Sequence, residues 1–262
     1  MPVQHKFLNC NNWINQGFWT ENAILKTNKY DPEVLFLGTF NHGFNWNTSD
    51  FFYGRGMYMW TIMSNLFIHN ENNSINRRTI NNNVPTLNQI FEICTKGKFV
   101  FADLIKGTKG NIDTVINQNQ KCVIVQDNNT QYCWNDYKDN SILDLINLGF
   151  IDVNVVEIIN HINNNPSIKF IYCTFKSGNH FIEMVNEIRR NIRPEVSIEY
   201  IFTPTGNGFR ENLQAPFDNR AWSISHCWIW NNLEHEVFIN KEEYSHLNHE
   251  WLINCGVDIL NF

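Results

Sequence analysis

Residues 31–60 read DPEVLFLGTFNHGFNWNTSDFFYGRGMYMW. The apolar run 34–37 stops at Gly38 and is followed by a polar loop and then by the aromatic cluster 51–53. A run that is apolar on both faces is typical of a central parallel strand covered by helices on both sides. In open α/β sheets, ligands bind just beyond the carboxyl ends of such strands. The loop 39–50 is therefore the first place to expect a functional site.

Strand-like and helix-like patterns alternate along the rest of the chain. Apolar runs predict strands at 98–105, 122–125, 168–175 and 196–203, and helical spacing predicts helices at 57–67, 86–94, 141–148, 153–162 and 179–192. We expect residues 1–30 to be irregular or partly helical and residues 220–262 to be mostly helical. This alternation predicts the α/β class, as a three-layer α/β/α sandwich with a mainly parallel central sheet. A length of 262 residues favours a single domain over residues 1–262.

The composition excludes several classes of protein. No apolar run reaches the roughly 18 residues of a transmembrane helix. The N-terminus lacks a secretory signal, so a cytoplasmic location is expected. The seven cysteines are widely spaced and form no C-x-x-C pair, which favours reduced thiols and argues against zinc or iron–sulfur sites. We expect no metal, no cofactor, no membrane contact and a monomeric protein.

The formal net charge of −6 is not by itself a footprint of nucleic-acid binding. Several cations nevertheless fall in loops expected near the site, namely Lys106, Lys109, Lys176, Arg210 and Arg220. They could form a local basic strip on an acidic protein. Scattered, solvated charges are the alternative, and the sequence leaves both interpretations open.

Three loops follow apolar strands and carry glycines. They are GTFNHG at 38–43, ADLIKGTKGNID at 102–113 and TPTGNGFR at 203–210. In a parallel sheet, all three would gather at one edge. Glycines let the backbone approach a ligand closely, and exposed backbone N–H groups suit phosphate oxygens. None of the loops matches a Walker P-loop or a dinucleotide-binding fingerprint.

The set and order of these segments resembles the uracil-DNA glycosylase superfamily, over roughly residues 32–210. The closest resemblance is to its hypoxanthine-DNA glycosylase-like branch and to the mismatch-specific uracil/thymine glycosylases. VLFLGTF is similar to the first motif, FFYGR to an aromatic–Tyr–Gly segment, and FADLIKGTKGNIDTVI to a strand with a basic turn. FIYCTF resembles the strand that reads the flipped base, and FTPTG the second motif, a Pro–Ser loop. The resemblance implies hydrolysis of the N-glycosidic bond of a deaminated base flipped out of DNA.

The resemblance also implies roles for individual residues. Tyr53 or Phe52 would form the aromatic platform for the base, with Phe40 opposite, and polar contacts would come from Thr39 and Thr174. The residues expected to contact DNA are Lys106, Lys109, Thr203, Pro204, Thr205, Gly206, Asn207 and Arg210.

The catalytic group is less directly implied, because the chain departs from the family pattern. Phe40 stands where many members have Asp or Asn, Asn41 where Pro is usual, and Thr203 where His or Asn is common. By elimination, the positioning of the attacking water falls on Asn41, His42 or Asp103.

Simpler interpretations of the same residues remain open. Asn41 is equally compatible with a turn, His42 with a surface loop, and Asp103 with a capping role. Phe52 and Tyr53 would also suit an ordinary core. Two other functions compete with a glycosylase. One is a non-catalytic nucleic-acid- or nucleotide-binding module, which Phe40 and Thr203 favour. The other is a hydrolase of a small nucleoside-like metabolite.

Overall fold

The protein has a mixed α/β fold, in a computed structural model that describes residues 3–44, 46–69, 83–109, 114–117, 122–127, 130–135, 139–175 and 179–200. The central sheet contains β1 (Phe18–Glu21), β2 (Ile24–Thr27), β3 (Val34–Gly38), β4 (Phe99–Asp103), β10 (Phe170–Cys173) and β11 (Ser197–Tyr200). The helices are η1 (Ile14–Gln16), α1 (Tyr58–Ser64) with the π-helical turn η2 (Asn65–His69), α2 (Leu87–Gly97), α3 (Asp139–Asn147), α4 (Val155–Asn164) and α5 (Asn179–Asn191). Outside the central sheet, β5 (Ile105–Thr108) pairs with β9 (Ile151–Val153), and an antiparallel meander contains β6 (Thr114–Asn117), β7 (Cys122–Asp127) and β8 (Thr130–Asn135).

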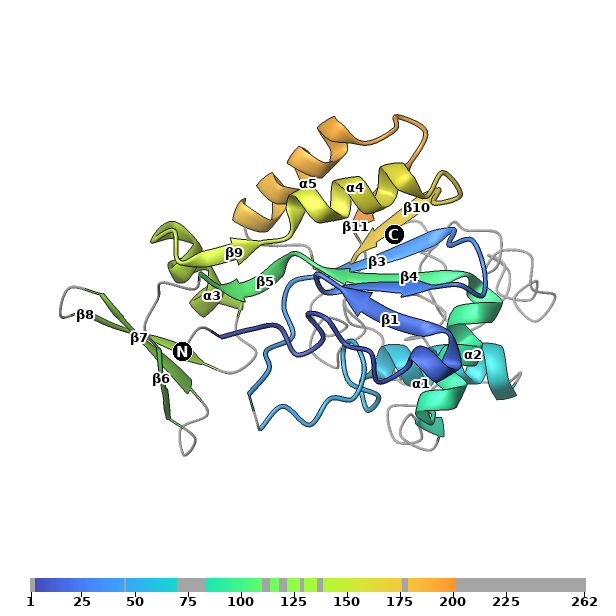
Figure 1. The fold of residues 1–262 in the computed structure, drawn as a ribbon, viewed down its shortest axis with the longest axis horizontal. Coiled ribbons are helices and arrows are strands. Elements are labelled where there is room, and N and C mark those ends of the chain that lie inside the picture. The colour runs from blue at the N-terminus through green and yellow to red at the C-terminus, as the bar shows by residue number, and fades with distance from the viewer. Residues whose placement is uncertain are drawn as a thin grey trace, which may run out of the picture.

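The order of the strands creates a topological switch point in the middle of the sheet. The order is β1-β2-β4-β3-β10-β11, in which the last four strands are parallel and the first two are antiparallel. β3 comes first of the four parallel strands in the chain and lies between β4 and β10 (Figure 1). At such a point, a crevice for ligands opens beyond the carboxyl ends of the strands. The expectation of a mainly parallel central sheet is confirmed.

The two faces of the sheet are packed with different side chains. Alternate residues of each strand point to opposite faces. Phe36, Phe101 and Tyr172 face α1 and α2 in an aromatic core, whereas Leu35 and Ile171 face α4 and α5 in an aliphatic core. Figure 1 shows these helix pairs on opposite sides of the sheet. All five residues of β3 are buried, which is why its sequence is apolar without alternation.

The expectation of irregular or helical structure over the first 30 residues is wrong for residues 18–27, which form the β1–β2 hairpin. Its two-residue turn consists of Asn22 (φ 51°) and Ala23 (φ 56°). Positive φ at both turn positions matches the twist of a hairpin, and glycine is the usual signal for it. The hairpin was not predicted because neither turn residue is a glycine.

Most other predicted elements are present with shifted boundaries. The predicted strand at 98–105 is interrupted at Leu104 and becomes β4 and β5. The helix predicted at 86–94 runs from Leu87 to Gly97, and Thr86 forms a capping box with Gln89 at its start. The strands β6, β8 and β9 were not predicted. The predicted loop at 204–219 and helices at 220–262 lie outside the described residues, so a single domain over 1–262 stays a prediction.

Two further expectations bear on the class of protein. Within the part of the chain that the structure describes, no helix is long and apolar enough to cross a membrane. Cys94 and Cys173 are free, buried thiols. Burial raises the pKa of the Cys173 thiol to about 12, so this thiol stays protonated at neutral pH.

Candidate functional site

Gly38 ends β3 and lies opposite Asp103, the last residue of β4. A Cβ atom on Gly38 would come within 2.3 Å of Asp103 Oδ1 and 2.9 Å of the Tyr53 hydroxyl oxygen. Both polar groups therefore occupy the space that a side chain would fill. This is the physical reason for glycine at the end of the first parallel strand.

Asp103 forms a buried pair with His5. The distance from His5 Nε2 to Asp103 Oδ2 is 2.7 Å, and the side chains are 0% and 6% exposed. The backbone N–H of Phe7 donates to His5 Nδ1 over 3.0 Å. Because Nδ1 accepts that hydrogen bond, the ring hydrogen lies on Nε2 and is donated to Asp103. Asp103 Oδ1 makes no hydrogen bond to the described residues, so His5 holds one oxygen of a carboxylate whose other oxygen has no such partner.

Tyr53 and Thr174 complete the cluster of polar side chains next to Gly38. The Thr174 hydroxyl, just after β10, lies 3.1 Å from the Tyr53 hydroxyl and 3.2 Å from the Leu37 carbonyl oxygen. Burial, and then the negative charge of Asp103, raise the pKa of Tyr53 well above its usual range. The phenol thus keeps its hydrogen at neutral pH and remains a hydrogen-bond donor. Tyr53 also has a positive φ of 63°, a strained conformation for this residue type.

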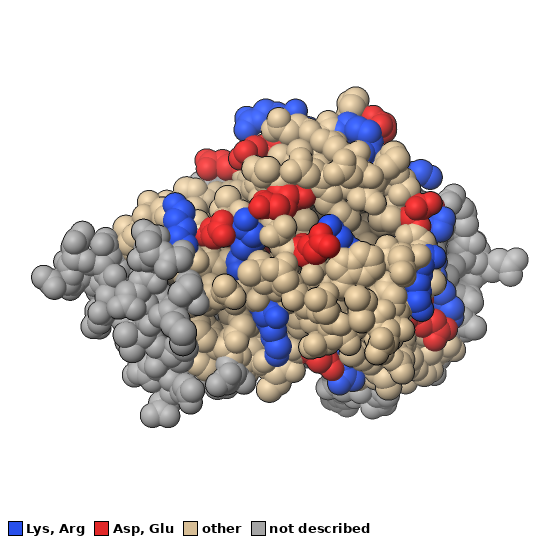
Figure 2. All heavy atoms as spheres, in the orientation of Figure 1, with Lys and Arg blue, Asp and Glu red and all other residues tan. Residues whose placement is uncertain are grey.

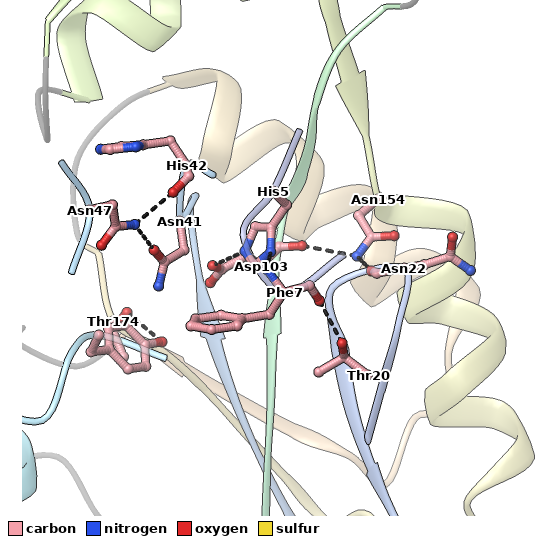
Figure 3. A network of polar contacts seen from close by, with 11 residues as sticks. His5, Phe7, Thr20, Asn22, Asn41, His42, Asn47, Asp103, Asn154 and Thr174 are labelled. Atoms are coloured by element: carbon pink, nitrogen blue, oxygen red, sulfur yellow. Dashed lines mark hydrogen bonds and ion pairs between the residues drawn. The ribbon is translucent and has the colours of Figure 1, made fainter. Parts of the chain in front are cut away.

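A chain of amide contacts fixes the orientation of the Asn41 side chain. Asn47 Oδ1 accepts from the backbone N–H of Ser49 (3.0 Å), while Asn47 Nδ2 donates to Asn41 Oδ1 (2.5 Å) and to the His42 carbonyl (2.7 Å). The Ser49 N–H can only donate, so it determines which way both amides face. Asn41 Nδ2 makes no hydrogen bond to the described residues, and Figure 3 shows it directed toward the side on which Thr174 lies.

His42 belongs to the same loop, but its ring points away from Asn41 and Asp103 (Figure 3). Its Nδ1 accepts from the backbone N–H of Phe44 over 3.3 Å, and the ring packs against Phe44 and Trp46. The structure therefore does not bring His42 to Asp103.

The predicted base-binding residues are only partly brought together. Thr39 and Phe40 are half-buried at the end of β3, and the Phe40 ring meets the His5 ring edge-on at 5.7 Å. Phe52 is 1% exposed and packs in the aromatic core against Phe7 and Phe101. Tyr53, rather than Phe52, thus lies where a ligand at this edge would meet an aromatic ring.

The predicted DNA-binding cations differ in their surroundings. Lys106 is half-buried and lies 2.8 Å from Glu157 and 3.5 Å from Asp152. Burial opposes its charge, but the two carboxylates outweigh burial and raise its pKa. Lys109 is exposed, and its backbone N–H donates to Phe150. Thr203, Pro204, Thr205, Gly206, Asn207 and Arg210 lie outside the described residues. Figure 2 shows basic and acidic side chains interspersed over the face in view.

A cavity of about 400 Å³ borders the cluster on the Tyr53 side. Its wall includes Ser49 and the ion pair in which Arg55 Nε lies 2.7 Å from Asp50 Oδ2. Within the described ranges, no group of three or more His, Cys, Asp or Glu side chains could hold a metal ion. The cluster itself offers a carboxylate, Asp103, and fixed hydrogen-bond donors on Asn41 and Tyr53.

The cluster contains four residues that the sequence analysis names, Asp103, Asn41, Tyr53 and Thr174, and one that it does not, His5. His5 precedes the first strand, and no motif or spacing connects it with the loops of the site. Comparisons of the chain with protein-family models, with curated proteins and with solved structures give no match.

Proposed function

We propose that the protein hydrolyses the N-glycosidic bond of a deaminated base, such as uracil or hypoxanthine, flipped out of DNA. One observation carries the proposal: a carboxylate, Asp103, at the switch point of a parallel sheet, with Oδ2 held by His5 and Oδ1 next to Gly38 without a hydrogen bond to the described residues. A held carboxylate with one open oxygen suits a general base for water. The resemblance to the uracil-DNA glycosylase superfamily supplies the substrate class.

In the proposed reaction, Asp103 Oδ1 accepts a hydrogen bond from a water molecule. The water oxygen attacks C1′ of the sugar, and one of its protons passes to Asp103. The bond between C1′ and the base nitrogen breaks, and its electron pair leaves with the base. Asp103 then releases the proton that it accepted, through solvent, to the departing base, and an abasic sugar remains. The step needs no metal or cofactor.

The leaving base would be held by fixed donors. Asn41 Nδ2 and the Tyr53 hydroxyl both carry hydrogens at the edge where Asp103 lies, and both suit carbonyl oxygens of a deaminated base. Negative charge grows on such oxygens as the glycosidic bond breaks, and preoriented donors stabilise it. Asn41 Oδ1 is already occupied by Asn47. We therefore assign Asn41 to the base and assign the water to Asp103.

Contacts to DNA phosphates would come from Lys109 and from the predicted loop 203–210 with Arg210. Lys106 is less suited to this role, because Glu157 and Asp152 already neutralise its charge. The cytoplasmic location and the monomeric state expected from the sequence belong to the same proposal.

A glycosylase assay tests the proposal. Oligonucleotides containing uracil, hypoxanthine or xanthine are incubated with the protein, and abasic sites are revealed by alkaline cleavage. Asp103→Asn keeps the shape of the side chain but cannot take a proton, so the single-turnover rate should fall about 10³-fold with DNA affinity retained. Asp144→Asn, on an exposed position of α3, is the matched control and should keep the wild-type rate. Asp103→Asn with the wild-type rate contradicts the assignment.

A hydrolase of a nucleoside-like metabolite is the second candidate. The observation that favours it is the neutralised charge of Lys106, together with the mixed charge of the face shown in Figure 2, neither of which selects a long polyanion. If free nucleosides, and not DNA, inhibit hydrolysis of the N-glycosidic bond, the result would favour this candidate.

A further inference from the structure

The N-terminal segment 3–7, here called the strap, lies along the carboxyl edge of the sheet. On one side it is tied to β5: the Thr108 N–H donates to the Val3 carbonyl (2.8 Å), and the His5 N–H donates to the Lys106 carbonyl (2.7 Å). On the other side it is tied to the site loop: the Lys6 N–H donates to the Asn41 carbonyl over 2.7 Å. Residues distant in sequence thus hold the strap across the site.

The close approach of the strap depends on Gly107 in β5. Gly107 pairs with Gln4 and has a φ of 151°. A Cβ atom at this position would come within 2.1 Å of the Val3 carbonyl oxygen. No other residue would let the backbone of the strap come this near to β5.

His5 belongs to the strap, and both of its ring nitrogens are hydrogen-bonded (Figure 3). Nδ1 accepts from the Phe7 N–H, and Nε2 donates to Asp103 Oδ2. The His5 side chain is fully buried. It therefore has no access to a ligand of its own and can influence chemistry only through Asp103. A carboxylate held by one oxygen keeps the plane that aims its other oxygen.

We propose that His5, supplied by the strap, is the positioning residue that aims Asp103 Oδ1 at the attacking water. This role rests on the proposed function. The contact between His5 and Asp103 fixes the direction of proton transfer without taking part in it. A displacement of about 1 Å in such a group is enough to lower a rate about 10²-fold.

Two substitutions separate the two ring contacts of His5. In His5→Gln, the amide nitrogen takes the place of Nε2, so donation to Asp103 persists and the acceptor for the Phe7 N–H is lost. In His5→Asn, the shorter side chain keeps an acceptor at the place of Nδ1 but no longer reaches Asp103. The pair of variants therefore distinguishes a positioning role from a purely structural one.

The single-turnover rate at saturating DNA is measured for both variants, together with DNA affinity and thermal unfolding. We expect His5→Asn to lose about 10²-fold in rate and His5→Gln to stay near the wild-type rate, with DNA affinity unchanged in both. Equal rates in the two variants, or a loss confined to His5→Gln, overturn the role. A wild-type protein that is inactive on every base overturns the proposed function itself.

A second measurement covers the case in which a variant does not fold. Nitrogen-15 NMR of the wild-type imidazoles should show His5 with its hydrogen on Nε2, in slow exchange with water. Asp103→Ala should speed that exchange, because the acceptor is gone. A His5 ring with its hydrogen on Nδ1 overturns the proposed role.

Discussion

Two regions of the molecule each bury a histidine, and their surroundings differ. At the carboxyl edge of the sheet, both nitrogens of His5 have partners. Between the β1–β2 hairpin and α4 lies a larger cavity, of about 480 Å³, whose wall includes His161. His161 Nδ1 lies 3.3 Å from Asn165 Nδ2, whereas Nε2 has no partner among the described residues. The larger cavity thus holds the less organised histidine.

The difference teaches that cavity size is a poor guide to chemistry in this fold. In the cavity between the β1–β2 hairpin and α4, here called the α4 cavity, Glu21 and Lys26 pair with each other. Burial, and then the charge of Lys26, lower the pKa of His161 to about 4. Its groups are therefore neutral or paired near pH 7. At the carboxyl edge, by contrast, Asp103 and Asn41 are each oriented by one hydrogen bond and each keep one polar atom without a partner among the described residues. The proposed site is therefore distinguished from the α4 cavity by the organisation of its polar groups and not by its volume.

Of the substitutions Gly38→Ala, Asn47→Ala and His161→Gln, the first should lower the single-turnover rate most. Its Cβ would collide with Asp103 Oδ1 and with the Tyr53 hydroxyl. We expect a loss of about 10²-fold in the single-turnover rate, from displacement of both groups. Gly56→Ala is the matched control, because nothing lies within 4 Å of the added atom. Equal rates for the two variants would show that Asp103 and Tyr53 are not needed above Gly38.

Asn47→Ala should have a smaller effect. Asn47 touches neither Asp103 nor the proposed base, but it determines which way the Asn41 amide faces. Without it, Asn41 can rotate and its donor is no longer preoriented, so we expect a loss of about tenfold in rate, the value of one hydrogen bond. Asn160→Ala, at an exposed position on α4, provides the comparison and should have no effect on the rate. A rate unchanged in Asn47→Ala would contradict the assignment of Asn41 to the base.

His161→Gln should leave the rate unchanged and alter only the pH dependence of stability. The folded pKa of about 4 lies below the ordinary 6.5, so between these values the unfolded chain binds a proton that the folded protein does not. Stability is therefore complete above pH 6.5 and falls by about 3 kcal/mol as the pH approaches 4. Urea unfolding at several pH values should show a flatter profile for His161→Gln. An unchanged profile would mean that another group causes the acid sensitivity.

The sequence predicted those parts of the site that follow from local patterns. The apolar run ending at Gly38 predicted β3 and its loop, and polar residues at the ends of later strands predicted Asp103 and Thr174. The fold class followed from the same alternation. These features depend on residues close together in the chain, where periodicity and glycine are informative.

The parts that the sequence did not predict depend on distant pairing. His5 reaches Asp103 only because the strap pairs with β5 and with the site loop, and no local pattern encodes such a pairing. The role of Asn47 was hidden for a different reason: asparagine is abundant in this chain, so a single asparagine carries little information. The orientation of His42 depended on contacts with Phe44 and Trp46 in an irregular loop.

The strap also has a kinetic consequence. Val3 bonds to Thr108 across a separation of 105 residues, so the loop that this contact closes is long and its closure entropy is large. Contacts of such long range form slowly in folding. During refolding, the parallel strands should therefore assemble before the strap docks, and the proposed glycosylase activity should return later than the circular dichroism signal of the sheet.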